Sequence, residues 1–326
     1  MDLEWDDKCT LSINLLTIIA RKLRAVKTRV CTLVPPAVAH AVPLWYDALG
    51  MTALPPTGSA PRADRLAFFL LKGVNKAIRE HHMIVDGDRV LVAVSGGKDS
   101  LALLDLLHRR RRMAPEDYVV VAGHVRSDHH CGRCVPEGWL RAWCAARDIA
   151  LVTGTMHVAD DIAASSDAGG AGPCFVCARR RRQAILELAR GHGCRVVALG
   201  HHADDLAETA LMNLFYNARL ETMAPTMSLF DGLVTLIRPL ATIEERDIVT
   251  YARAAGYPIT GELCPDGARS RRALVRRLLR EVESDHHGVK RRVLSATTKA
   301  QQHALGARDD GPRAASHPEE DDRVGY

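Results

Sequence analysis

The sequence predicts an α/β fold: a doubly wound, mainly parallel sheet with helical additions at both ends of the chain. Short apolar runs that suit strands covered on both faces alternate with helical segments. One of these runs leads directly through a glycine-rich turn into a helix, as a strand of such a sheet does. With 47% hydrophobic residues, the 326-residue chain can also bury a substantial core.

The expected elements follow this alternation along the chain. Strands are predicted at 90–94, 118–124, 150–153 and 195–199. Helices are predicted at 62–82, 101–112, 178–190, 206–215 and 271–283, and a loop at 167–172. Because helices separate the successive strands, we expect those strands to run parallel.

The chain divides into a main domain and flanking segments. The main domain is expected at 61–265, followed by a basic helical segment at 266–300. Residues 1–60 read as a poorly defined extension, with a candidate amphipathic helix at 11–26 and no recognisable chemistry. Residues 301–326 are polar and charged, which predicts a disordered tail.

Composition favours a cytoplasmic protein without a membrane segment. Residues 1–8 are acidic, unlike the basic start of a secretory signal. The apolar stretch 11–20 is about half the length that a membrane span needs. Nine cysteines are then better read as thiols or metal ligands than as disulfides. The net charge of +5 permits a polyanionic partner.

The turn after the first predicted strand has the residues of a phosphate-binding loop. It reads Ser95-Gly96-Gly97-Lys98-Asp99-Ser100. The two glycines let the backbone approach an anion, and the free N–H groups at the helix start attract negative charge. Lys98 adds a mobile positive charge, and the two serines add hydroxyl donors. The spacing does not match an ordinary P-loop ATPase.

A second polar cluster follows the strand 195–199. It reads Gly200-His201-His202-Ala203-Asp204-Asp205. This position is the carboxyl end of the sheet, where open α/β sheets bind ligands. Asp204 and Asp205 can supply oxygen ligands for Mg²⁺, or Asp205 can act as a base. Alternatively they cap the next helix. His201 and His202 are expected to position nucleotide or substrate.

Three cysteines stand out from the rest. Cys174 and Cys177 are separated by two residues and lie just before a predicted helix, whose N-terminus favours the thiolate form. This spacing suits either a metal site or a redox pair. Cys264 lies in a predicted turn, whereas Cys144 and Cys194 read as core residues.

Two groups of arginines are candidates for contacts with phosphate. Four consecutive arginines occupy 179–182, so some of them must face the cysteine pair. On the helix 269–280, one face carries Arg269, Arg272, Arg276 and Arg280, opposite Leu274, Leu278 and Val282. That spacing suits an exposed phosphate-contacting surface or an ordinary solvated face.

These motifs resemble known proteins. The segment 95–100 resembles the pyrophosphate loop of the PP-loop ATP pyrophosphatases, which have the adenine nucleotide alpha-hydrolase-like fold and cleave ATP between its α and β phosphates. From Ala63 to Ala296 the chain resembles the tRNA 2-thiocytidine synthetase family, the iron–sulfur-dependent branch. The matching segments are 83–84, 86–89, 173–174, 177–179, 198–205, 213–216, 223–225 and 237–240.

The resemblance implies an ATP- and Mg²⁺-dependent tRNA sulfurtransferase. In that family the 2-oxo group of a cytidine in the anticodon stem-loop is adenylated and replaced by sulfur carried on a [4Fe–4S] cluster. The implied cluster ligands are Cys174, Cys177 and Cys264, although the donor set also leaves zinc open. Lys98, Asp99 and Asp205 are the implied catalytic residues beside the cysteines. A sulfur donor such as a cysteine desulfurase is expected, and a homodimer is a further expectation.

The sequence is also compatible with other functions. They are thiolation of another base or a small molecule, a sulfonucleotide reductase, and a non-catalytic RNA-binding or redox-sensing relative. A reductase normally carries a cysteine near its C-terminus, and none follows Cys264 here. Arg126 stands where the family usually has an acidic residue after a strand. Nearby, Cys131 and Cys134 with His129 and His130 form a second metal site, a sulfur relay or a simple loop.

Overall fold

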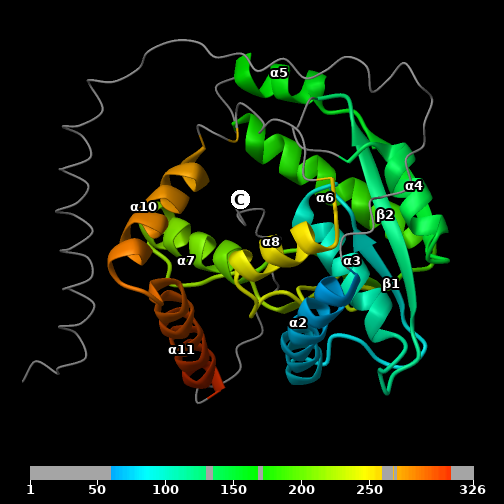
Figure 1. Ribbon diagram of the computed structural model, residues 1–326. Coiled ribbons are helices and arrows are strands. Elements are labelled where there is room, and N and C mark those ends of the chain that lie inside the picture. Colours follow the sequence, from blue (N-terminus) through cyan, green and yellow to red (C-terminus); the bar gives the residue numbers. More distant parts are fainter. Residues whose placement is uncertain (1–59, 130–134, 168–171, 259–266, 268–269, 310–326) are drawn as a thin grey trace, which may run out of the picture. The chain divides into compact units, whose positions relative to one another are not determined.

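The computed structural model of the chain describes residues 60–129, 135–167, 172–258, 267 and 270–309 (Figure 1). The expectations for residues 1–59 and for Cys131, Cys134 and Cys264 lie outside these described residues. Within them, no helix is both long enough and apolar enough to cross a bilayer.

Six strands form one sheet in the order β3-β2-β1-β4-β6-β5. They are β1 (Arg89–Ala93), β2 (Val119–Ser127), β3 (Ala150–Met156), β4 (Val196–Ala198), β5 (Thr226–Leu229) and β6 (Val234–Ile237). All neighbours are parallel except β5, which pairs antiparallel with β6 at one edge. The doubly wound, mainly parallel sheet is therefore confirmed. Its strand order reverses between β1 and β4, which is the topological switch point.

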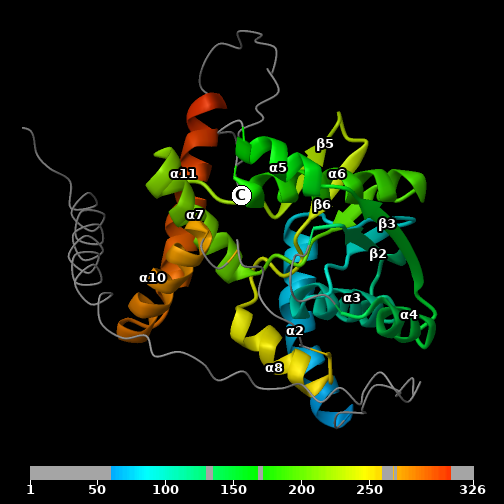
Figure 2. The ribbon, with the colours of Figure 1, turned by 90° about the horizontal axis from the view of Figure 1, so that it is seen from above.

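Helices cover both faces of the sheet and form a group beside it. Their bounds are α2 (Ala60–Glu80), α3 (Lys98–Arg110), α4 (Glu137–Ala145), α5 (Ala159–Asp167), α6 (Pro173–Gly191), α7 (Ala203–Asn217), α8 (Glu245–Ala254), α10 (Arg271–Asp285) and α11 (Val289–Asp309). In Figure 2 the helices α2, α3, α4 and α8 lie on one side of the sheet, and α5 and α6 lie on the other. The helices α7, α10 and α11 pack together as the third group.

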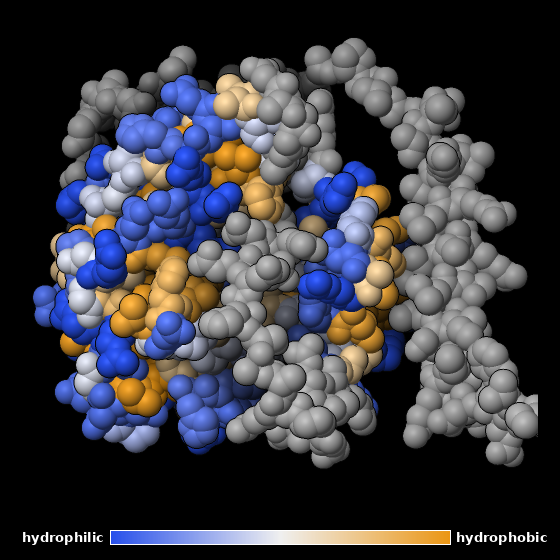
Figure 3. Space-filling model, turned by 180° about the vertical axis from the view of Figure 1, so that it is seen from behind, coloured by the Kyte–Doolittle hydropathy of each residue, from blue (hydrophilic) through white to orange (hydrophobic). Residues whose placement is uncertain are grey.

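The alternation of side chains along β1 builds two separate cores. Val90 and Val92 belong to the larger core, which includes the apolar residues of α2, α3 and α8. Leu91, between them, points to the opposite face and packs with Ile185 of α6. Apolar and hydrophilic residues both reach the surface, where they lie in several groups on the face seen in Figure 3.

The third group of helices corrects two expectations. On α10 the buried residues are Val275 and Leu279, which pack against α7 and α11, so the predicted apolar face is displaced. The helix α11 was missed, and it continues to Asp309. The segment predicted to be disordered from residue 301 is therefore helical over its first nine positions, while 310–326 lies outside the described residues.

Candidate active site

The loop between β1 and α3 presents the start of a helix to an anion. Gly96 has a positive φ of 89°, which favours glycine, and Gly97 is the N-cap of α3 without a side-chain cap. Ser95 Oγ accepts a hydrogen bond from the Gly97 N–H at 3.3 Å, and Ser100 Oγ donates to the Gly97 carbonyl at 2.9 Å. The N–H groups that follow in the first turn have no acceptor within the helix. The predicted loop thus has the geometry of an anion site.

Lys98 is held between two carboxylates. Its ammonium lies 2.8 Å from Oε1 of Glu245 and 3.0 Å from Oδ2 of Asp99. Burial by itself would lower the pKa of Lys98, but the two carboxylates outweigh it and raise that pKa. The lysine therefore remains charged at neutral pH and carries its charge at the mouth of the loop.

The carboxylate of Asp99 is partly buried beside Lys98. Burial raises its pKa in spite of the attraction to His202 and Lys98. Its Oδ1 is buried and has no hydrogen-bond partner in the structure. A buried carboxylate oxygen without a partner is costly, so this atom is available to a cation or a donor group on a ligand.

The loop after β4 lies against the start of α3. A side chain at Gly200 would meet the backbone N of Ser100 at 3.0 Å and the backbone C of Asp99 at 3.1 Å. These contacts are tighter than ordinary van der Waals contact and involve backbone atoms, so a side chain here would require the backbone to shift by a few tenths of an ångström. The two polar motifs of the sequence are therefore in direct contact at the switch point between β1 and β4.

His202 and Asp205 form a capping box at the start of α7. The His202 side chain accepts from the Asp205 N–H at 3.4 Å, and Asp205 Oδ2 accepts from the His202 N–H at 3.1 Å. The other ring nitrogen, Nε2, lies 3.4 Å from Asp205 Oδ2 and 3.7 Å from Asp99 Oδ1. Capping is thus shown for Asp205, and its role as a base or a metal ligand stays a prediction. Burial lowers the pKa of the neighbouring His201, which favours a neutral ring.

Asp204 is engaged as an anchor. Its Oδ2 accepts from the Glu245 N–H at 2.7 Å, and its Oδ1 pairs with the ammonium of Lys290 on α11. These contacts fix the start of α8, which carries Glu245, against α7. With both oxygens occupied, Asp204 is less suited to the predicted Mg²⁺ site than Asp99 and Glu245. Glu245 was missed because an acidic residue at a helix start is an ordinary dipole partner.

Two arginines of α10, Arg272 and Arg276, contact residues of α7. Arg276 forms a bidentate pair with Glu208, at 2.6 and 3.0 Å, and Arg272 donates to Thr209 Oγ1 at 3.0 Å. Arg272 also lies 3.5 Å from Asp205 Oδ1. The prediction of an exposed phosphate-contacting stripe is wrong for these two residues, because buried acids on α7 attract them. Arg280 is exposed as expected, and Arg269 lies outside the described residues.

Cys174 and Cys177 lie inside the first turn of α6, because Pro173 begins that helix earlier than predicted. Cys174 is exposed and Cys177 is half-buried, with the Arg181 guanidinium 3.7 Å from its sulfur. Residues three apart lie on one side of a helix. Since α6 precedes the parallel strand β4 and packs along β2 and β3, its N-terminus lies at the carboxyl edge of the sheet, as the phosphate loop does.

The other cysteines singled out in the sequence are the core residues Cys144 and Cys194 and those of the segment 129–134. Cys144 and Cys194 are buried core residues as expected, and burial raises the pKa of both thiols. Of the cluster at 129–134, only His129 is described. Just before it, Asp128 accepts from the N–H groups of Val158 and Ala159 at the start of α5. Among the described residues, no group of three His, Cys, Asp or Glu side chains is placed to hold a metal.

Comparison with known proteins connects this geometry to a family. Residues 71–282 match the model of the PP-loop domain. The tRNA-cytidine(32) 2-sulfurtransferase of Geobacter metallireducens is 37% identical over 238 residues, covering 70% of this chain and 88% of the relative. The enzyme of the same name from Deinococcus radiodurans is 36% identical over 252 residues, covering 76% and 83%.

A solved structure shows the same fold. The U34-tRNA thiolase NcsA from Methanococcus maripaludis, solved with its [4Fe–4S] cluster, aligns with a TM-score of 0.59 at 20% identity. The alignment covers 74% of this chain and 80% of that one. At that identity the likeness concerns the fold, whereas the closer relatives decide the family. The chain belongs to the PP-loop proteins and, among them, to the tRNA-cytidine(32) 2-sulfurtransferase family.

Proposed function

We propose that this protein is an ATP-dependent tRNA sulfurtransferase that converts a cytidine of the anticodon stem-loop to 2-thiocytidine. One observation carries the proposal: the phosphate loop, the polar segment 200–205 and Glu245 lie together at the switch point of the sheet. The curated relatives act on cytidine(32), by their name, and share more than a third of their residues with this chain over the aligned region. That relationship supports the choice of base.

Activation requires the loop to hold the departing pyrophosphate. The cytidine O2 attacks the α-phosphorus of ATP, the bond to the β-phosphate oxygen breaks, and pyrophosphate leaves. The N–H groups at the start of α3 and the Lys98 ammonium face the charge that develops on the leaving group. Lys98 must release Glu245 to reach it, which frees a carboxylate at the same moment.

Two carboxylates suit a magnesium ion in this site. Asp99 has a buried oxygen without a hydrogen-bond partner. Glu245 Oε1 lies 2.8 Å from the Lys98 ammonium, which also contacts Asp99. Mg²⁺ is commonly bound by one or two carboxylates, with substrate phosphates and water completing the coordination. The residues therefore fit the ion, which when bound screens the charge of the phosphates. Asp99 and Glu245 would hold it, and His202 Nε2 lies 3.7 Å from Asp99 Oδ1.

The cysteines of α6 suit the sulfur-carrying part of the site. Cys174 and Cys177 lie one turn apart at a helix N-terminus, where the dipole and Arg181 favour thiolates. With Cys264, whose placement lies outside the described residues, they would supply the three thiolates of a [4Fe–4S] cluster, which when bound would carry the sulfur to be transferred. That sulfur would replace O2 of the activated cytidine: a bond to C2 would form, the C2–O bond would break, and AMP would leave with the former O2.

The proposal is tested with anaerobically prepared protein, tRNA, ATP and Mg²⁺. AMP formation should depend on tRNA, and digestion of the product should yield 2-thiocytidine. A tRNA in which cytidine(32) is replaced by uridine is the matched control and should give no thiolated cytidine. ATP hydrolysis that is independent of tRNA, without a thiolated nucleoside, would contradict the proposal.

Metal analysis separates the cluster from a zinc site. Iron and sulfide should be lost in Cys174→Ser, Cys177→Ser and Cys264→Ser, and retained in Cys194→Ser, whose thiol is in the core. Tightly bound zinc without iron would remove the cluster from the proposal while leaving the ATP step to be judged by AMP formation.

A further inference from the structure

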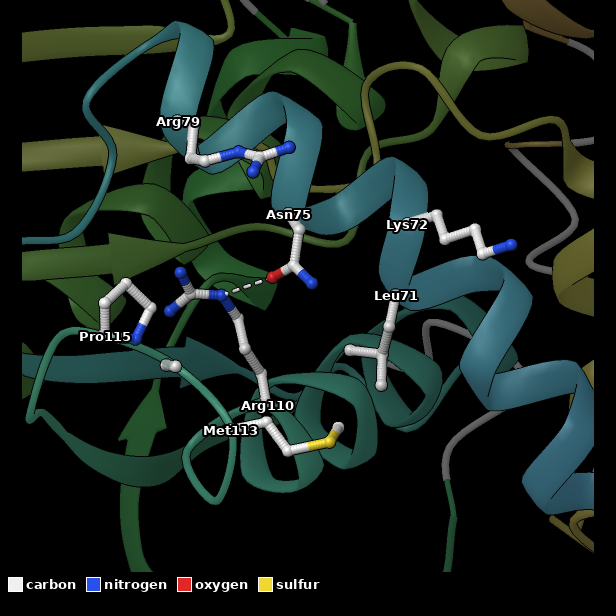
Figure 4. Close-up of a pocket in the computed structure, with 8 residues that line it drawn as sticks. Leu71, Lys72, Asn75, Arg79, Arg110, Met113 and Pro115 are labelled. Carbon is white, nitrogen blue, oxygen red and sulfur yellow. Dashed lines mark hydrogen bonds between the residues drawn. The ribbon is translucent and has the colours of Figure 1, made fainter.

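A cavity lies between α2 and the end of α3, far from the phosphate loop at the other end of α3. Its volume is about 340 Å³, and α3 is 13 residues long, which places the two sites about 18 Å apart. The cavity is lined by Leu71, Lys72, Asn75, Arg79, Arg110, Met113, Ala114 and Pro115 (Figure 4). Three lining residues are cationic and none is acidic; Glu116 pairs with one of the three, Arg110, so the charge that remains is positive and favours an anion.

Arg110 is the fixed part of this cavity. The residue is only 2% exposed, and its Nε donates to Asn75 Oδ1 at 2.8 Å while Nη2 donates to Glu116 at 2.7 Å. Its Nη1 is buried and has no hydrogen-bond partner in the structure. A buried guanidinium N–H without an acceptor is costly, and a ligand oxygen is the group that would satisfy it.

Arg79 supplies the movable part. It is exposed on α2, and Figure 4 shows its guanidinium on the opposite side of the cavity from Pro115. Lys72 contributes its stem, because its ammonium lies over the rings of Phe68 and Phe69, at 4.9 and 5.1 Å. The exposed residues Arg111 and Arg112 follow at the end of α3 and extend the positive surface beyond the cavity.

We propose that this cavity binds a backbone phosphate of the RNA substrate, at a point distant from the reacting base. The phosphate oxygens would meet Arg79 and Arg110, and the attached sugar would lie against Leu71 and Met113. An isolated phosphate compound has the same chemistry, but the exposed arginines next to the cavity favour a polyanion. The inference rests on the proposed function, since it takes tRNA as the substrate.

The test measures binding of an unmodified tRNA transcript to the full chain at several salt concentrations. Met113 is 71% exposed, so Met113→Glu places a carboxylate at the cavity without disturbing the core, and Met113→Gln is its neutral control. Arg79→Ala removes the movable cation. Lys76→Ala is its control, because Lys76 is exposed on the same helix but does not line the cavity.

Met113→Glu and Arg79→Ala should each weaken tRNA binding about five- to tenfold, and Arg79→Ala should reduce the salt slope by about one. The two controls should stay within about twofold of the parent protein. Parent-like binding by both test variants would overturn the proposal. So would loss of inorganic phosphate binding in Arg79→Ala with tRNA binding retained, which would assign the cavity to a free phosphate compound.

Turnover keeps this inference separate from the proposed function. AMP formation at saturating tRNA should be the same in Lys76→Ala as in the parent protein, because Lys76 lines neither the cavity nor the phosphate loop. If the parent protein forms no AMP in a tRNA-dependent manner, the proposed reaction fails, and the binding comparison still decides whether RNA occupies the cavity.

Discussion

The ammonium of Lys98 lies 2.8 Å from Oε1 of Glu245, a residue 147 positions later in the chain. Glu245 begins α8, and its backbone N–H is held by Asp204 at the start of α7. The lysine of the phosphate loop is thus neutralised by an acid that two other helices position. An anionic ligand must displace this acid, so Glu245 competes with phosphate for Lys98.

Glu245→Gln should separate the two roles of this carboxylate. Without Mg²⁺, ATP binding should strengthen about two- to threefold, because the competing charge is gone. With ATP saturating, the Mg²⁺ concentration for half-maximal AMP formation should rise about tenfold, because one hard oxygen ligand is lost. Calorimetric titration of ATP and a Mg²⁺ series of AMP formation provide the two measurements.

The matched control for this pair of measurements is Glu244→Gln. Glu244 is the adjacent acid, and its side chain pairs with Arg246 at 2.9 Å instead of Lys98. If Glu245→Gln and Glu244→Gln have the same Mg²⁺ requirement, Glu245 is not a ligand of the ion.

Asp204 should make the protein sensitive to acid. Burial alone would raise its pKa, but the bonds from Lys290 and from the Glu245 N–H outweigh it and lower that pKa below 3.8. A carboxyl with a lowered pKa contributes stability above its ordinary value, and that contribution is lost as pH falls through the folded-state value. Urea unfolding at a series of pH values from 7 to about 3 measures the free energy of unfolding.

Asp204→Asn should therefore be less stable than the parent protein at pH 7, and the difference should shrink as the solution is acidified below about pH 4. Asp247→Asn is the control, because Asp247 is 57% exposed and lies 4.0 Å from Arg246. A difference between Asp204→Asn and the parent that stays constant with pH would show that Asp204 is not stabilised as a carboxylate.

Local patterns explain which parts of this molecule were predictable. The strand, turn and helix around 90–110 could be predicted because a continuous apolar run, two glycines, a lysine and a leucine-rich helical segment follow one another within about twenty residues. The same is true of the Asp205 motif, whose place at the carboxyl edge follows from the preceding strand. Contacts across long stretches of chain were not predictable. Glu245 and the inward turn of Arg272 and Arg276 depend on how α7, α8 and α10 pack, and no local signal encodes that.

Asp105 on α3 should contribute strongly to the free energy of unfolding. This buried carboxylate accepts hydrogen bonds from Tyr251 at 2.5 Å and Tyr257 at 2.9 Å, and it pairs with Arg109 at 3.2 Å. Asp105→Ala leaves both hydroxyls and the guanidinium without this acceptor, so the free energy of unfolding should fall by about 3 kcal/mol. Asp64→Ala is a stringent comparison. Asp64 pairs with the same Arg109 at 2.7 Å but is exposed, and its loss should cost less than about 1 kcal/mol by urea unfolding.

Gly200 should be required for the alignment of the two motifs. In Gly200→Ala the new Cβ would meet the backbone of Ser100 and Asp99 at 3.0–3.1 Å, so the loop after β4 or the start of α3 must move. Because small displacements of catalytic groups slow the reaction strongly, kcat/KM for ATP should fall about a hundredfold. The free energy of unfolding should fall by about 1–3 kcal/mol, the usual cost of overpacking.

The control is Gly138→Ala. Gly138 lies in α4, and a Cβ there would meet nothing within 4 Å. The exchange should leave ATP turnover unchanged and stabilise the helix by up to about 1 kcal/mol, since alanine is the better helix former. Comparing thermal unfolding with the steady-state kinetics of both variants separates the effects. A Gly200→Ala protein that turns over ATP as the parent does would show that the loop after β4 and the start of α3 need not touch during the reaction.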